Sequence, residues 1–173
     1  MSQFRPRLSQ QQYKALENLR ANERRILVIG DLHCPFELDG YLEHCLDTYD
    51  RFNCNQVIFI GDIIDNHYSS YHETDPNGMG GGYELKQAIK HVAKWAEAFP
   101  VADVIIGNHD RIIMRKAFSS SVPKEWIKDY NDVLGTSWNW VERIEYDGVQ
   151  YCHGEGGTAR YECVCRLDGR KQF

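Results

Sequence analysis

The sequence predicts an α/β fold in which helices cover a parallel β-sheet. Through residue 108, short apolar runs alternate with segments of helical periodicity in the order strand, helix, strand, helix, strand. This alternation is typical of parallel strands joined by crossover helices. The 173 residues are enough for one domain with a sizeable core but few for two, so we expect a single domain over 1–173. Hydrophobic residues at 42% and charged residues at 26% exclude wholesale disorder.

The region before the first strand predicts a helix. Ser9 is a suitable N-cap with Gln12 as its capping-box partner, and a helix from there to about Asn22 would form an extension over 1–24. The first residues lack the apolar stretch of a secretory signal, and no run approaches the roughly 18 apolar residues of a membrane span. We therefore expect a cytoplasmic protein with no membrane partner.

Three apolar runs predict the strands of the sheet, at 26–29, 57–60 and 104–106. The unbroken first run indicates a strand buried on both faces. Segments 39–49 and 85–99 carry apolar residues at helical spacing and are predicted helices. Right-handed crossovers would place the ends of all three strands at one edge of the sheet.

The pattern changes after the third strand. Pro123 predicts the first turn of a helix that continues to about Leu134. Asp147-Gly148 predicts the turn of a β-hairpin with strands at 143–146 and 149–152. The alternation over 161–167 predicts one more strand.

Each strand of the predicted sheet ends in glycine followed by polar side chains. The three ends read Gly30-Asp31-Leu32-His33, Gly61-Asp62-Ile63-Ile64-Asp65 and Gly107-Asn108-His109-Asp110. Ligands bind beyond the carboxyl ends of strands in open α/β sheets, so these groups should converge on one crevice. Repulsion among the carboxylates of Asp31, Asp62 and Asp65 would be costly unless a cation neutralised it. Carboxylate, imidazole and amide ligands together suit Mn²⁺, Fe²⁺ or Zn²⁺.

Charge and cysteine content narrow the function classes. The formal net charge of −5 provides no global field that attracts polyanions, although a metal site can hold phosphate locally. In a reducing compartment the six cysteines are expected to be thiols or metal ligands rather than disulfides.

The motifs Gly-Asp-x-His, Gly-Asp-x-x-Asp and Gly-Asn-His-Asp, in this order and spacing, resemble those of the calcineurin-like metallophosphoesterase family over roughly 26–160. The sequence around them, including Tyr68-x-x-Tyr71-His72-Glu73, is most similar to phosphoesterases of phages and bacteria. A phage-encoded protein would act in the host cytoplasm. The resemblance implies a β-sandwich flanked by helices (αββα). It also implies hydrolysis of phosphoesters with two divalent ions, Mn²⁺ first, with Fe, Zn, Ni or Co as alternatives.

The resemblance also implies a role for each motif residue. Asp31 and His33 would bind the first metal, and Asp62 would bridge both. Asn108 and His153 would bind the second metal, although Cys152 stands where the family has a glycine before this histidine. A hydroxide activated by the ions would attack phosphorus.

The remaining site candidates are residues that would contact the substrate. By the resemblance, His109, hydrogen-bonded to Asp65, would donate a proton to the leaving oxygen. His67 and His72 lie in the loop after the second motif, and Arg111 follows the third. These three are candidate substrate-binding residues. The alternative is an ordinary solvated loop for the histidines and a solvated helix face for Arg111.

The pattern breaks at the C-terminus, where the family's final Gly-His-x-His motif is missing and 161–173 form a divergent tail. Each ion would then be one histidine short. Water is the simplest replacement ligand, and the other candidates are Cys163 or Cys165, His67 or His72, and another subunit. Cys152, His153, Cys163 and Cys165 would alternatively form a separate zinc site. The second sheet should be shortened, and its exposed hairpin edge predicts self-association.

Two functions remain open at this point. The first is a metallophosphoesterase, with a nuclease or nucleotide phosphodiesterase favoured over a protein phosphatase. The reason is that Asp65-Asn66 stands where similar protein phosphatases carry Asp-Arg-Gly. The second is a catalytically weak or silent metal- or phosphate-binding module that arose by loss of the final motif.

Overall fold

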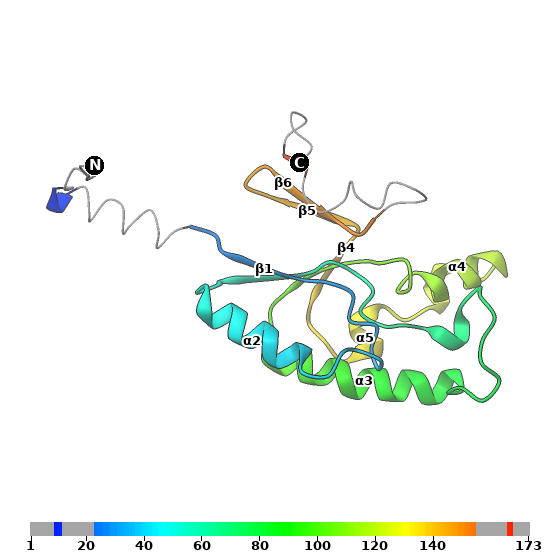
Figure 1. The fold of residues 1–173 in the computed structure, drawn as a ribbon. Coiled ribbons are helices and arrows are strands. Elements are labelled where there is room, and N and C mark those ends of the chain that lie inside the picture. The colour runs from blue at the N-terminus through cyan, green and yellow to red at the C-terminus, as the bar shows by residue number, and fades with distance from the viewer. Residues whose placement is uncertain (1–8, 12–22, 155–165, 168–173) are drawn as a thin grey trace, which may run out of the picture.

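A computed structural model describes residues 9–11, 23–154 and 166–167 (Figure 1). Gln10 and Gln11 are helical, and the rest of the predicted N-terminal helix lies outside these residues. The same is true of most of the predicted C-terminal tail, so the boundaries at 1–24 and 161–173 stay predictions. No helix in the described part of the chain combines the length and the apolar character needed to cross a membrane.

A four-stranded parallel sheet, in the order β1-β2-β3-β4, forms the centre of the fold. Its strands are β1 (Ile26–Ile29), β2 (Gln56–Phe59), β3 (Asp103–Ile105) and β4 (Asn139–Val141). The first three confirm the predicted strands and their parallel direction. Strand β4 was not predicted, because three residues offer too few positions for an alternating pattern.

Helices cover one face of this sheet (Figure 1). The predicted helices at 39–49 and 85–99 are confirmed as α2 (Tyr41–Arg51) and α3 (Gly81–Ala98). The helix predicted from Pro123 to Leu134 is wrong, because the chain forms a 3₁₀ turn, Lys124–Trp126, and then α5 (Tyr130–Leu134). Ile127 is extended between them, and the Asp129 side chain caps a new helix by accepting from the N–H of Asp132.

A three-stranded antiparallel sheet, in the order β5-β6-β7, lies on the other face. The hairpin of β5 (Arg143–Tyr146) and β6 (Val149–Cys152) is confirmed. Its turn residues Asp147 and Gly148 both have positive φ, at 54° and 77°, as a type I′ turn requires. Strand β7 (Arg166–Leu167) pairs with β6, while the predicted 161–165 lie outside the described residues. The αββα sandwich with a shortened second sheet therefore stays a prediction beyond these strands.

Two hydrophobic clusters hold the layers together. The larger one packs the helices against the sheet around Phe59, Trp95, Phe99 and Trp138, and the indole N–H of Trp138 donates to the Phe99 carbonyl. The smaller one joins β2 and β3 to the hairpin. Burial of β1 on both faces is wrong: Leu27 and Ile29 are buried, but Val28 is exposed, because β1 lies at the edge of the sheet.

Candidate metal centre

The loops that follow β1 and β2 run side by side beyond the sheet. The N–H of His33 donates to the Asp62 carbonyl at 2.9 Å, and the N–H of Cys34 donates to the Ile63 carbonyl at 2.9 Å. His33 and Asp62 both adopt left-handed backbone conformations, with φ of 50° and 52°. Such conformations are uncommon for residues other than glycine, although Asp and His adopt them more readily than most, and they concentrate at functional sites. The two loops thus hold the side chains of the first two motifs together.

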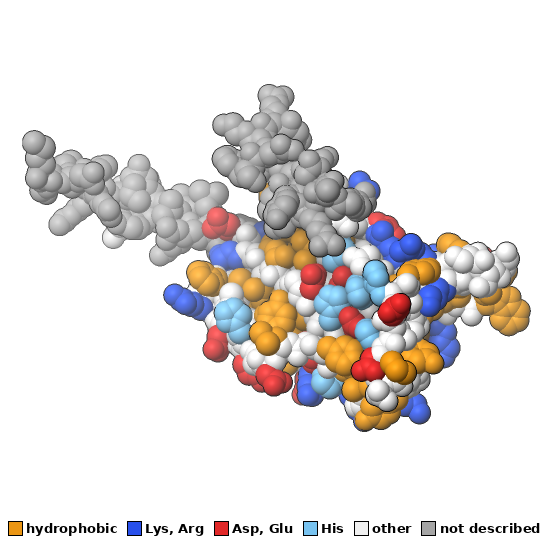
Figure 2. Space-filling view, turned by 45° about the vertical axis from the view of Figure 1, so that its right-hand side comes forward, with side chains coloured by type: hydrophobic (Ala, Val, Ile, Leu, Met, Phe, Trp, Pro, Cys, Tyr) orange, Lys and Arg blue, Asp and Glu red, His pale blue; other side chains and the backbone are white. Residues whose placement is uncertain are grey.

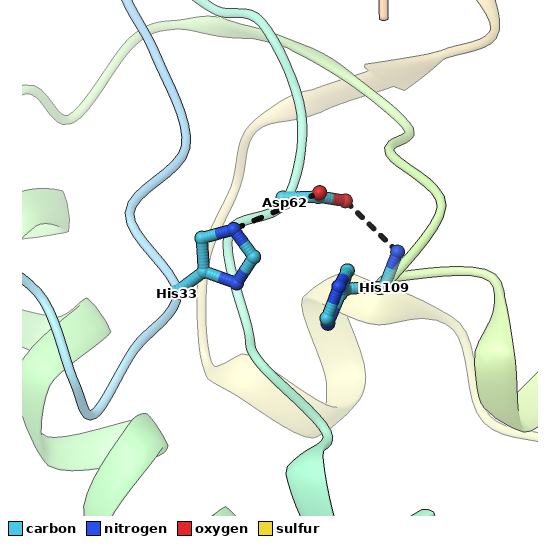
Figure 3. A group of neighbouring side chains, drawn as sticks. All are labelled: His33, Asp62 and His109. Atoms are coloured by element: carbon cyan, nitrogen blue, oxygen red, sulfur yellow. Dashed lines mark hydrogen bonds and ion pairs between the residues drawn. The ribbon is translucent and has the colours of Figure 1, made fainter. Parts of the chain in front are cut away.

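Asp62 lies at the centre of the site and is only 4% exposed. Its carboxylate belongs to two groups of potential metal ligands, one with His33 and His109 and the other with Asp31 and His153. The ligand atoms of each group lie within 4.8 Å of one another. Figure 3 shows the first group, with the carboxylate between the two histidines. A single buried carboxylate shared by two groups is the arrangement that a bridging ligand requires.

His153 reaches this carboxylate from the end of β6. Its Nδ1–H donates to the Ile60 carbonyl at 2.8 Å, while Nε2 lies 2.9 Å from Asn108 Oδ1 and 3.3 Å from Asp62 Oδ2. The hydrogen bond to Asp62 is the main cause that raises the pKa of His153 to about 9. A divalent ion bound here would replace the Nε2 proton, because a metal-binding imidazole is neutral.

Opposing effects act on Asp62 itself. Burial raises the pKa of its carboxyl, but hydrogen bonds from His153 and the backbone N–H of His109 outweigh it and hold the pKa below its usual value. The N–H of His109 donates to Oδ1 at 2.8 Å. The side chain is therefore charged at neutral pH and held in a fixed orientation.

Asp65 contacts two histidines in different ways. Its carboxylate accepts from Nδ1–H of His33 at 2.7 Å. His109 instead donates from Nδ1 to the backbone carbonyl of Asp65 at 2.5 Å, and lies 3.5 Å from the carboxylate. The expected hydrogen bond between Asp65 and His109 is present, but its acceptor is the main-chain carbonyl, and the carboxylate instead orients His33. Sequence spacing cannot distinguish these contacts, because the His33 and His109 imidazoles both lie beside the loop that carries Asp65.

Asp110, which sequence analysis quoted without a role, connects the second and third motifs. It is 1% exposed, and its two carboxylate oxygens accept four backbone N–H groups, from Gly107, Asp62, Ile63 and Ile64. Burial is the main cause that raises its pKa to about 6. Its place three residues after Gly107, at the end of a buried strand, was the available signal for this role.

We expect Asp110→Asn to destabilise the protein by about 2 kcal/mol or more, because an amide NH₂ would face two backbone donors that then lack an acceptor. The free energy of unfolding from urea titration measures this. The exposed Asp132→Asn is the matched control, since its side chain lies on the surface of α5. Equal stability of the two variants would contradict the role given to Asp110.

Glycines permit the close approach of the three motifs. A Cβ at Gly107 would collide with the Asp62 carboxylate and backbone nitrogen, and a Cβ at Gly61 would lie 2.5 Å from His153 Nδ1. Gly61 also has φ of 109°, which L-residues rarely adopt. These two glycines therefore let the bridging carboxylate and His153 share one small space.

The three candidate substrate-binding residues are placed differently. His67 is partly exposed, with Nδ1 3.9 Å from Asp65 Oδ2, at the edge of the centre. His72 is exposed, and the structure gives its backbone N–H a bond to Ser70 Oγ. The Arg111 guanidinium pairs with Glu142, and Arg111 does not line the cavity that contains the proposed metal ligands. Of the three, His67 is the one that the structure places next to another predicted site residue, Asp65.

A cavity of about 880 Å³ opens at this edge of the sheet. Its lining includes the proposed ligands Asp31, His33, Asp62, Asn108 and His153, together with His109. The lining also includes apolar residues that were not predicted from the sequence: Phe36 and Leu38 from the segment between β1 and α2, and Tyr41 at the start of α2. Large apolar residues in a short loop directly after the first motif were the available signal.

The cysteines proposed as replacement metal ligands stay predictions. Cys163 and Cys165 lie outside the described residues, and no disulfide is present among the described cysteines. Cys152 lines the cavity beside His153.

Comparison with known proteins identifies one family. The model of that family, described as calcineurin-like phosphoesterase, matches residues 24–167. No curated protein and no solved structure gives a significant match.

Proposed function

Because this chain belongs to the calcineurin-like phosphoesterase family, we propose that it hydrolyses phosphoester bonds with two divalent metal ions at the carboxyl edge of its parallel sheet. The observation that supports this most strongly is the buried Asp62 carboxylate, which two groups of potential metal ligands share. Such a carboxylate next to Asp31 and Asp110 is favourable when cations offset the repulsion.

The residues present fit a pair of divalent ions. By the family resemblance, Asp31, His33 and Asp62 would hold the first, and Asp62, Asn108 and His153 the second. The structure instead groups Asp31 with Asp62 and His153, and His33 with Asp62 and His109. Their oxygen and imidazole donors suit Mn²⁺, with Fe, Zn, Ni and Co as alternatives. When bound, such ions polarise the phosphoryl group and activate water for attack on phosphorus.

The chain orients these ligands through their second ring nitrogens. His33 uses Nδ1 for Asp65, and His153 uses Nδ1 for the Ile60 carbonyl, so that Nε2 of each ring is directed to the centre. A ligating histidine normally has such a partner, which fixes its tautomer and raises its basicity. Asp65 is therefore a positioning residue.

His109 is the proposed proton donor. The Asp65 carbonyl accepts from its Nδ1, which leaves Nε2 to carry the proton that passes to the leaving oxygen. Asn66 supports this placement, since its side-chain amide donates to the His109 carbonyl at 3.0 Å. Asn66 also occupies the position where similar protein phosphatases have arginine, which favours a nuclease or nucleotide phosphodiesterase.

Metal removal tests the proposal. We expect dialysis against a chelator to abolish hydrolysis of bis-p-nitrophenyl phosphate and Mn²⁺ to restore it. Metal analysis should find up to two ions per chain. Bound metal should also raise the unfolding free energy by about 2.7 kcal/mol at 100 times the dissociation constant. Full activity of metal-free protein would contradict the proposal, and metal binding without hydrolysis would favour the silent module.

A further inference from the structure

We infer that Phe36 and Leu38 form a subsite that binds an aromatic ring of the phosphoester substrate, such as the base of a nucleoside phosphate. This inference rests on the proposed function and names the substrate class of the same site. The carrying observation is that both side chains are exposed, at 50% and 76%, on the wall of the cavity that contains the proposed metal ligands.

The loop that presents these side chains is anchored on both sides. The N–H of Phe36 donates to the His33 carbonyl at 2.7 Å, and the Tyr41 N–H donates to the Leu38 carbonyl at 3.1 Å. Between them, the Glu37 carboxylate accepts from His91 Nδ1 of α3 at 2.6 Å. The Tyr41 hydroxyl donates to the carbonyl of Gly30, the first residue of the first motif, at 3.0 Å. Phe36 and Leu38 therefore face outward from a loop whose other contacts hold it in place.

Exposed apolar side chains that occur singly need no explanation, but these two stand together beside a polar centre. Figure 2 shows hydrophobic side chains next to the gathered histidines and carboxylates on one face. A phosphate held at the centre would place its organic group within the same cavity. A preformed cavity lined by apolar side chains together with a few polar groups is typical of sites for small organic ligands.

Aromatic rings are the substrate groups that Phe36 and Leu38 would bind best. The Phe36 ring offers a flat face, and Leu38 adds an aliphatic contact two residues further on. Stacking of a base on an aromatic side chain tolerates any base, because every base has a π-face. Phe36 carries no charge and no hydrogen-bond donor, so the subsite would select a ring without reading base identity.

Direct binding to the manganese-loaded full chain tests the subsite. Calorimetry would compare thymidine 5′-monophosphate with methyl phosphate, which has the phosphate but no ring. We expect the nucleotide to bind roughly tenfold more tightly, and this ratio to fall towards one in Phe36→Ala and in Leu38→Ala. Phe118→Ala is the matched control, because Phe118 is 56% exposed on α4 (Ile112–Ser119) and does not line the cavity; it should keep the wild-type ratio.

The outcomes are distinguishable. A wild-type ratio near one, or a ratio that Phe36→Ala leaves unchanged, overturns the subsite while phosphate binding stands. Absence of binding by both compounds and by inorganic phosphate contradicts the proposed function itself. A 5′-phosphorylated oligothymidylate, measured in parallel, separates two sources of the ring. Tighter binding than the mononucleotide indicates a nucleic-acid end, and equal binding indicates a free nucleotide; both support the subsite if Phe36→Ala weakens them.

Discussion

Asp62→Asn is expected to reduce Mn²⁺-dependent hydrolysis of bis-p-nitrophenyl phosphate by about 10²- to 10³-fold or more. The substitution removes the negative charge that both proposed metal sites share, while the side chain keeps nearly the same shape. Asparagine also tolerates the left-handed backbone that this position requires, so the loop can keep its conformation. The remaining Oδ1 can still accept from the His109 N–H. The loss should therefore come from metal binding and catalysis rather than from unfolding.

The measurements are the metal content after desalting, kcat/KM with Mn²⁺, and the unfolding free energy. Asp47→Asn is the matched control, because Asp47 is exposed on α2 and does not line the cavity. We expect this control to keep wild-type metal content and activity. If Asp62→Asn hydrolyses the ester as fast as the wild type does, the shared carboxylate does not bridge catalytic ions, and the proposed function fails.

The part of the site that follows from topology was predictable from the sequence. Apolar runs that end in glycine and a polar residue indicated the strands and the edge where their ends meet. The parallel registers of β1, β2 and β3 confirm that edge. Asp31, Asp62 and Asn108 come together there because each follows a strand of the same sheet. His153 joins them from the predicted hairpin, whose turn chemistry was equally plain.

Contacts that depend on side-chain orientation and main-chain bonds were not predictable. The sequence places Asp65 near both His33 and His109, but only the folded loop directs the carboxylate to one and the carbonyl to the other. The same holds for Asp110, since its four backbone donors come from two separate loops. Local sequence patterns also gave wrong or missing elements where other contacts determine the structure. The break before α5 depends on the Asp129 cap, and β4 forms by pairing with β3.

His109→Ala is expected to slow hydrolysis by about 10²- to 10⁴-fold for esters with a poor leaving group. An alkoxide needs a proton as it departs, whereas p-nitrophenolate leaves readily without one. The defect should therefore be much smaller for bis-p-nitrophenyl phosphate than for a nucleoside phosphodiester with an alkyl leaving group. This dependence on the leaving group is the readout that a merely structural histidine would not produce.

Metal content decides between the two roles that geometry allows for His109. The ring lies edge-on to His33, with ring centres 4.6 Å apart, and belongs to the group of potential ligands with His33 and Asp62. A proton donor predicts that His109→Ala keeps both ions, and a ligand predicts that one is lost. His44→Ala, which removes an exposed histidine on α2, controls for nonspecific metal binding. Equal loss of activity for all leaving groups, together with loss of an ion, would reassign His109 as a metal ligand.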